Sequence, residues 1–184
     1  MDEIKVKNIF AAVSDKLILD PLLEIFDANS VKFWGTEGTT SYLKSKGFGA
    51  QSVVSGFDFD GRVKSLDKKV FAAILADRSK KTHLDELKKL GVEPIDAVVV
   101  NLYPLDKNSF PGSMDIGGQA LVRAAIKNYK NVAVAFDEES IKELTEELKS
   151  DHSSTFEFRK TQAKKAVKFI AERSKSEIDY LKNL

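Results

Sequence analysis

Residues 96–102 read DAVVVNL, and this stretch decides the fold. Four apolar side chains follow one another in it, so a strand formed here would be buried on both faces. Such a strand belongs in the middle of a parallel sheet, because crossover helices then cover both sides of the sheet. The stretch therefore predicts an α/β protein with this strand near the centre of its sheet.

Apolar segments on either side of this strand alternate with segments of helical periodicity. Strands are predicted at residues 9–13, 31–34, 51–55 and 132–136. Helices are predicted at residues 20–28, 39–46, 84–90, 119–127 and 140–149, the last with Asp137 as its cap. Loops are predicted at residues 56–68 and 103–118. Residues 70–76 fit a helix or a strand, and residues 154–181 fit one or two helices.

This order predicts a three-layer sandwich in which a mainly parallel sheet lies between helices. The 184 residues suggest a single domain over 1–184, with a core at about 8–150 and terminal helices at about 154–184.

Composition excludes several classes of function. The formal net charge is +1, which provides no general field for a nucleic-acid backbone. There is no cysteine and there are only two histidines, His83 and His152, both expected at the surface, so a thiolate or histidine metal site is not expected. The N-terminus lacks the apolar core of a signal peptide, and no apolar run is long enough to cross a bilayer. A soluble, cytoplasmic protein that binds neither nucleic acid nor membrane is expected.

In an open parallel sheet, ligands bind outside the carboxyl ends of the strands. Four polar clusters follow predicted strands there. They are Ser14-Asp15-Lys16, the turn from Gly35 to Thr39, the segment from Gly61 to Ser65, and Asn101-Leu102-Tyr103 with Asp115-Ile116-Gly117-Gly118 in the same connection.

The first two clusters suit a phosphate group. Glycine lets backbone N–H groups approach an anion closely, hydroxyls add donors, and a helix is predicted to begin after each cluster. Lys16 adds a cation. Ser14 and Asp15 also fit an ordinary helix cap, and Gly35 to Thr39 also fits a plain turn.

The other clusters are open to two interpretations each. Arg62 and Lys64 could face one anionic ligand or form a solvated pair of surface charges. Tyr103 could donate from its hydroxyl in catalysis or pack as an apolar ring. Asp115 could cap the next helix, and Lys127 stands where a cation is favourable at a helix C-terminus. The residues alone predict an α/β protein for a phosphorylated ligand and leave the reaction open.

A family resemblance narrows the reaction. The strings AVSDK (12–16), GRVKSLDKKV (61–70), IDAVVVNLYPL (95–105) and DIGGQALVRAAIKN (115–128) resemble inosine monophosphate cyclohydrolase, usually the N-terminal half of a bifunctional purine-biosynthesis enzyme. The resemblance runs over residues 8–136 and weakens beyond them. It implies a stand-alone enzyme that closes 5-formamidoimidazole-4-carboxamide ribonucleotide (FAICAR) to inosine monophosphate (IMP) with loss of water. It implies no cofactor and no metal, a fold like that of methylglyoxal synthase, and a homodimer as one option.

The same resemblance implies roles for individual residues. The implied catalytic residues are Lys64, Tyr103, Asp115 and Lys127, with Asp115 and Lys127 as a proton-handling pair. The implied substrate-binding residues are Ser14, Asp15, Lys16, Thr36, Glu37, Gly38, Thr39, Arg62, Val63, Ser65, Asn101, Leu102, Ile116 and Gly117.

Two departures from the family keep other functions open. Glu37 stands where the family usually has glycine, and residues 64–73 read KSLDKKVFAA where the family usually reads KTLHPKVHGG. A regulatory domain of the same fold would bind a phosphorylated effector or a purine nucleotide through the first two clusters and catalyse nothing. A degraded relative that binds purine nucleotides without turnover is the third option.

Overall fold

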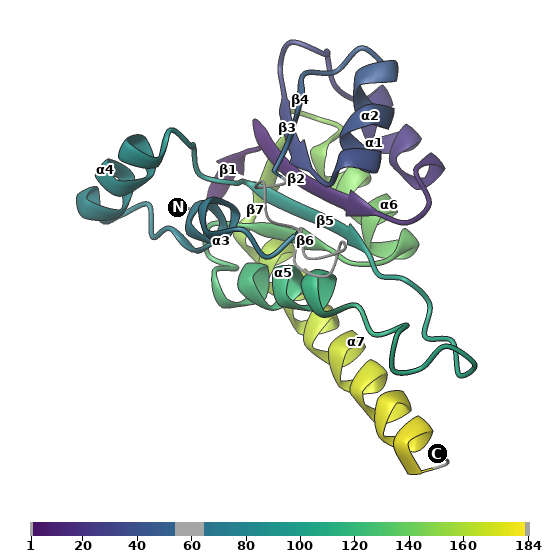
Figure 1. Cartoon of the computed structure of the whole chain (residues 1–184). Coiled ribbons are helices and arrows are strands. Elements are labelled where there is room, and N and C mark those ends of the chain that lie inside the picture. The colour runs from purple at the N-terminus through teal and green to yellow at the C-terminus, as the bar shows by residue number, and fades with distance from the viewer. Residues whose placement is uncertain (1, 54–64, 183–184) are drawn as a thin grey trace.

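The computed structural model describes residues 2–53 and 65–182, and its centre is a sheet of five parallel strands in the order β4-β3-β2-β5-β6 (Figure 1). The strands are β2 (Asn8–Val13), β3 (Lys32–Gly35), β4 (Ala50–Ser52), β5 (Ala97–Asn101) and β6 (Ala133–Ala135). The parallel sheet predicted from DAVVVNL is therefore confirmed, and this stretch supplies an inner strand.

The two faces of the sheet carry separate apolar cores, as the alternation of side chains along a strand requires. In β5, Val98 and Val100 pack with Phe10 in one core, while Ala97 and Val99 pack with Ile9 in the other. All of these side chains are buried. A strand apolar on both faces is thus buried on both faces.

Helices form the outer two layers (Figure 1). The first face is covered by α1 (Asp20–Glu24), α2 (Glu37–Ser45) and α6 (Glu138–Leu148). The second face is covered by α3 (Lys68–Leu75), α5 (Ile116–Lys127) and the long α7 (Phe156–Lys182), and α4 (Lys81–Leu90) packs on the outside of α3. The sandwich predicted from the sequence is therefore present, and of the ambiguous residues 70–76 all but Ala76 belong to a helix.

Several predicted boundaries were wrong. The helix predicted at 20–28 is the short α1 preceded by a 3₁₀ turn, η1 (Leu17–Leu19), and the strand predicted at 51–55 is β4. A second sheet was missed, in which β1 (Glu3–Lys5) pairs antiparallel with β7 (Ser153–Thr155). Both strands are only three residues long, too short for a periodic signal. Among the described residues, no helix combines the length and apolar character needed to cross a membrane.

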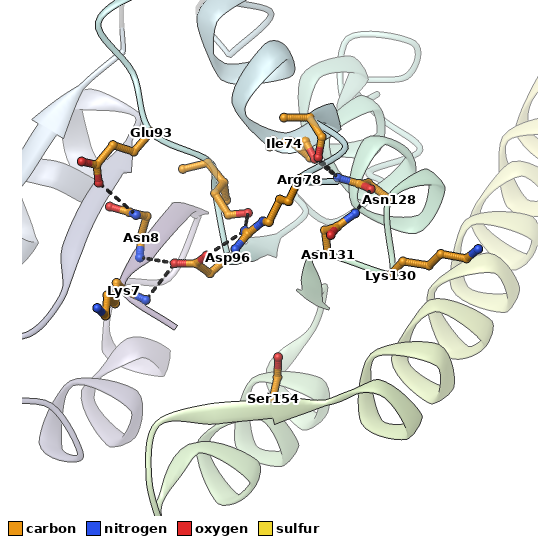
Figure 2. A network of polar contacts seen from close by, with 12 residues as sticks. Lys7, Asn8, Ile74, Arg78, Glu93, Asp96, Asn128, Lys130, Asn131 and Ser154 are labelled. Atoms are coloured by element: carbon orange, nitrogen blue, oxygen red, sulfur yellow. Dashed lines mark hydrogen bonds and ion pairs between the residues drawn. The ribbon is translucent and has the colours of Figure 1, made fainter. Parts of the chain in front are cut away.

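Buried polar groups fasten the amino edge of the sheet, where β2 and β5 begin (Figure 2). The carboxylate of Asp96 accepts hydrogen bonds from the backbone N–H groups of Lys7 at 2.8 Å and Asn8 at 2.7 Å. It also pairs with Arg78 Nη2 at 2.7 Å. Asp96 is 3% exposed, so its charge depends on these partners.

Arg159 of α7 binds the segment that leads into β6, at the same edge of the sheet. Its guanidinium, fully buried, donates to the backbone carbonyls of Tyr129, Lys130 and Ser154. Burial lowers the pKa of Arg159, and the nearby charge of Arg78 adds to this lowering. The amino edge is therefore built for stability, with cations held by backbone oxygens and one carboxylate.

We predict that Asp96→Asn lowers the free energy of unfolding by about 3 kcal/mol, because it leaves Arg78 without its buried counter-charge. Urea denaturation followed by circular dichroism measures the change. Asp85→Asn is the matched control, since Asp85 is exposed on α4. Equal stability of the two variants would show that the Asp96 pair does not hold the amino edge.

Candidate functional site

The carboxyl edge of the sheet gathers polar side chains from three neighbouring strands. Val13 at the end of β2 lies opposite Asn101 at the end of β5, and Ala11 lies opposite Gly35 of β3. The Ser14 hydroxyl donates a hydrogen bond to Asn101 Oδ1. The clusters that follow β2 and β5, distant in sequence, are therefore in direct contact.

The first turn of α2 faces this edge with its backbone donors. Thr36 is the N-cap residue in an extended conformation, and its side chain makes no capping hydrogen bond. The first N–H groups of a helix have no partner within the helix, so those of Glu37, Gly38 and Thr39 are directed outward at the positive end of the helix dipole. This arrangement can bind an anion.

The side chain of Thr39 ties α2 to the end of β2. It is buried, and its hydroxyl accepts a hydrogen bond from Val13 N at 3.3 Å. The Thr36 hydroxyl lies 3.3 Å from it. Gly35 must be glycine, because any Cβ at this position would collide with the backbone carbonyl of Ala11. The close approach of β3 to β2 thus places the first turn of α2 beside the loop after β2.

Lys16 brings a cation to this turn. Its ammonium donates to the carbonyls of Ser14, at 3.0 Å, and Val13. A methyl group built on Gly38 would lie 4.0 Å from Lys16 Nζ, so the ammonium stands over the first turn of α2. Partial burial lowers the pKa of Lys16, and the charge of Asp15 partly opposes this. A bound anion would replace the lost hydration and favour the charged amine.

The two carboxylates predicted near the anion, Asp15 and Glu37, are exposed to solvent. Asp15 is exposed and accepts from Leu17 N at 3.0 Å, which makes it a local turn residue. The cap on α1 that Ser14 and Asp15 also fitted is absent, since η1 intervenes. Glu37 is exposed at the start of α2, where water screens its charge.

The connection after β5 presents Tyr103 and buries Leu102. Tyr103 is 59% exposed, so the alternative of a packed ring does not hold. Leu102 is buried against Gly118, which leaves its backbone as the part that could meet a ligand. Tyr103 is therefore the phenol available at the carboxyl edge.

Asp115 begins α5 beside this connection. Its Oδ1 accepts a hydrogen bond from Gly118 N at 2.7 Å, so Asp115 is the helix cap that the sequence allowed. A Cβ on Gly118 would lie 2.6 Å from Asp115 Oδ2, so only glycine lets the carboxylate fold over the helix end. Gly117 contacts Ser65, and Ile116 is exposed. The start of α5 thus joins the segment before α3 to the carboxyl edge.

The structure does not pair Asp115 with Lys127. Asp115 precedes the first residue of α5 and Lys127 is its last residue. At a rise of about 1.5 Å per residue, the two are separated by about 18 Å along the helix axis. Lys127 is exposed, and the next residue, Asn128, bonds the carbonyls at the end of α3. The predicted proton-handling pair is therefore wrong within one chain.

Three further predicted residues, Arg62, Val63 and Lys64, lie outside the described residues. We use the name carboxyl-edge site for nine of the described residues, which are Ser14, Lys16, Thr36, Glu37, Gly38, Thr39, Asn101, Tyr103 and Asp115.

The histidines are partly exposed, and the ring of each contacts a backbone group. His83 Nδ1 accepts from Asp77 N at 3.0 Å, and His152 Nε2 lies 2.8 Å from the carbonyl of Ile25. No group of three or more His, Asp or Glu residues able to hold a metal ion occurs within 2–53 and 65–182.

Two hollows lie between α6 and α7, at about 240 Å³ and 740 Å³. Their linings share Glu139, Glu143 and Lys165, of which the last two form an ion pair with each other. None of the predicted site residues within the described ranges lines either hollow.

Sequence reasoning missed one contact of the carboxyl-edge site. Arg173 of α7 donates from Nη2 to the backbone carbonyl of Tyr103 at 2.6 Å. No local pattern links residues 70 positions apart.

Comparison with known proteins supports the same assignment of fold. Residues 19–132 match the family model described as MGS-like domain. The chain is 35% identical over 193 residues to the bifunctional purine biosynthesis protein PurH of Rhodopirellula baltica, covering 98% of this chain and 37% of that protein. PurH of Bradyrhizobium diazoefficiens is 36% identical over 163 residues, covering 82% of this chain and 31% of that protein.

A solved structure extends the comparison to three dimensions. The crystal structure of ForH superposes with a TM-score of 0.75 at 26% identity, covering 96% of this chain and 98% of that chain. The chain spans about a third of the length of the PurH relatives and nearly all of ForH. With the family model covering more than half of its residues, this chain belongs to the MGS-like domain family.

Proposed function

We propose that this chain is an IMP cyclohydrolase that closes FAICAR to IMP with loss of water. The observation that carries the proposal is that Lys16 stands over the first turn of α2, while Tyr103 and Asp115 lie in the connection that leaves β5 at the same edge of the sheet. The match to the N-terminal part of bifunctional PurH supports it. A ribotide has a phosphate at one end and its reacting groups at the other. Its site therefore needs anion-binding groups in one place and polar side chains for the reaction in another.

The phosphate would bind at the first turn of α2. The N–H groups of Gly38 and Thr39, the Thr36 hydroxyl and the Lys16 ammonium supply donors of the types that phosphate accepts. Held there, the ribotide extends over the ends of β2 and β5 toward Asn101 and Tyr103.

Ring closure needs few groups because both reactants belong to one molecule. The carboxamide nitrogen attacks the formyl carbon, a C–N bond forms, the C=O π bond opens, and the formyl oxygen becomes the oxyanion of a carbinolamine. That oxygen takes up the proton that the attacking nitrogen loses. The formamide nitrogen then gives up its proton, the hydroxyl leaves as water, and the C=N bond of the purine ring forms. Positioning supplies much of the rate, and a donor to the developing oxyanion supplies more.

The Tyr103 hydroxyl is the donor we assign to that oxyanion, since its ring stands exposed at the edge. Lys64 is the second cation that the family resemblance implies. Asp115 would handle protons through Oδ2, the carboxylate oxygen that does not bond Gly118 N. Lys127 has no place in this single-chain site, because it lies at the far end of α5.

The second candidate function is a regulatory domain that binds a phosphorylated effector without chemistry. The remote position of Lys127 favours it, as does the use of Asp115 as a helix cap. The phosphate-binding half of the site would be the same in both functions. Turnover is therefore the measurement that separates them.

We predict that the protein converts FAICAR to IMP in the presence of EDTA, followed by ultraviolet absorbance. Tyr103→Phe should lower kcat about a hundredfold, the usual effect of removing one oxyanion donor. The Kd for IMP should change less than about threefold, because the ring and the phosphate site remain.

Tyr129→Phe is the matched control, since Tyr129 lies near the amino edge and packs on Phe156 through its ring. IMP binding without turnover in the wild-type protein would support the regulatory domain. Full turnover in Tyr103→Phe would remove Tyr103 from the mechanism.

We predict that IMP affinity falls at alkaline pH through the loss of the Lys16 proton. The pKa of Lys16 lies below its ordinary value of 10.5 because burial desolvates the amine. The phosphate monoester is a dianion above about pH 6, so the ion pair exists below the pKa of Lys16 and is lost as pH rises through it. Isothermal titration at a series of pH values measures this.

Lys16→Met should bind IMP about tenfold more weakly at neutral pH and lose this alkaline dependence. Lys44→Met, at the other end of α2, should retain both the affinity and the pH profile of the wild-type protein. A wild-type pH profile in Lys16→Met would contradict the assignment of Lys16 to the phosphate.

A further inference from the structure

The second half of α7 lies along the connection between β5 and α5, which is residues 102–115 and contains no helix or strand. Arg173 makes the first contact, donating from Nη2 to the Tyr103 carbonyl at 2.6 Å. The Arg173 side chain is 10% exposed, so the guanidinium is held between α7 and the connection. The contact fixes the backbone of the residue whose phenol stands at the carboxyl edge.

Two more residues on the same side of α7 contact the connection and the start of α5. Glu177 Oε1 lies 4.0 Å from Arg173 Nε and accepts a hydrogen bond from Gln119 Nε2 of α5 at 3.0 Å. The Tyr180 ring packs edge-on against Phe110, with centroids 5.5 Å apart. Spacings of four and seven residues place all three on one face of a helix.

This face, formed by Arg173, Glu177 and Tyr180, touches the connection at its start, near its middle and just beyond its end. The Tyr103 side chain has few neighbours of its own, since it is 59% exposed. The Arg173 contact restrains the backbone from which this side chain projects. Small displacements of a catalytic group are costly, because a donor must meet the oxyanion at hydrogen-bond distance.

We propose that Arg173 is a positioning residue, which holds Tyr103 in the place needed for ring closure, and that Glu177 supplies its counter-charge. The proposal rests on the proposed cyclohydrolase function. The first turn of α2 follows β3, and Lys16 follows β2, so neither belongs to the connection that Arg173 contacts. Arg173 should therefore affect the chemical step and leave phosphate binding unchanged.

The test compares Arg173→Met, Arg173→Lys and the control Lys175→Met, which removes a charge from an exposed position of the same helix. Arg173→Met should lower kcat about tenfold and leave the Kd for IMP within about twofold. Arg173→Lys should restore part of the loss, because it still offers a donor to the carbonyl. Lys175→Met should behave as the wild-type protein.

A double-mutant cycle shows whether Arg173 acts through Tyr103. In the Tyr103→Phe background, Arg173→Met should cost less than about threefold in kcat. Fully additive losses would show that Arg173 acts by another route and would overturn the proposal. Glu177→Gln, which keeps its size and its bond to Gln119, should give a smaller loss and serves if Arg173→Met does not fold.

Amide hydrogen exchange tests the positioning without reference to turnover. The amides of residues 103–110 should exchange faster in Arg173→Met than in the wild-type protein and Lys175→Met. An inactive wild-type protein would refute the cyclohydrolase function, and exchange would still decide whether Arg173 holds the connection. Unchanged exchange together with unchanged kcat would overturn the inference alone.

Discussion

The parallel pairing of β2 with β5 is the constraint on which the rest of the structure depends. Both strands are apolar on both faces, so the pair is stable only between two layers of helices. Because all five strands run the same way, every strand ends at one edge of the sheet. That single fact brings Ser14 to Asn101 and places the first turn of α2 beside Lys16.

The two edges of the sheet do different work. At the amino edge, buried Asp96 is paired with Arg78 and accepts from backbone N–H groups (Figure 2). Buried Arg159 donates to backbone carbonyls. At the carboxyl edge, helix donors and a half-buried amine are arranged around a surface that a ligand can reach. The buried polar contacts that stabilise the fold lie where the strands begin, so the groups where the strands end are available for binding.

The sequence predicted the central sheet and the turn that leads into α2 because both follow from local patterns. DAVVVNL is apolar in every core position, and the glycine and threonine residues at 35–39 precede a helix. The short pairing of β1 with β7 and the Arg173 contact join distant segments, so no local pattern reports them. The Asp115–Lys127 pair was wrong because it was taken from a family resemblance in sequence, which does not show that the whole length of α5 separates the two residues.

A crystal structure with IMP bound tests the central claim most directly. The account predicts the phosphate within hydrogen-bond distance of the N–H groups of Gly38 and Thr39 and of Lys16 Nζ, with the purine extending toward Tyr103. A phosphate bound elsewhere, such as the groove between α6 and α7, would contradict the account. So would a purine ring directed away from the end of β5.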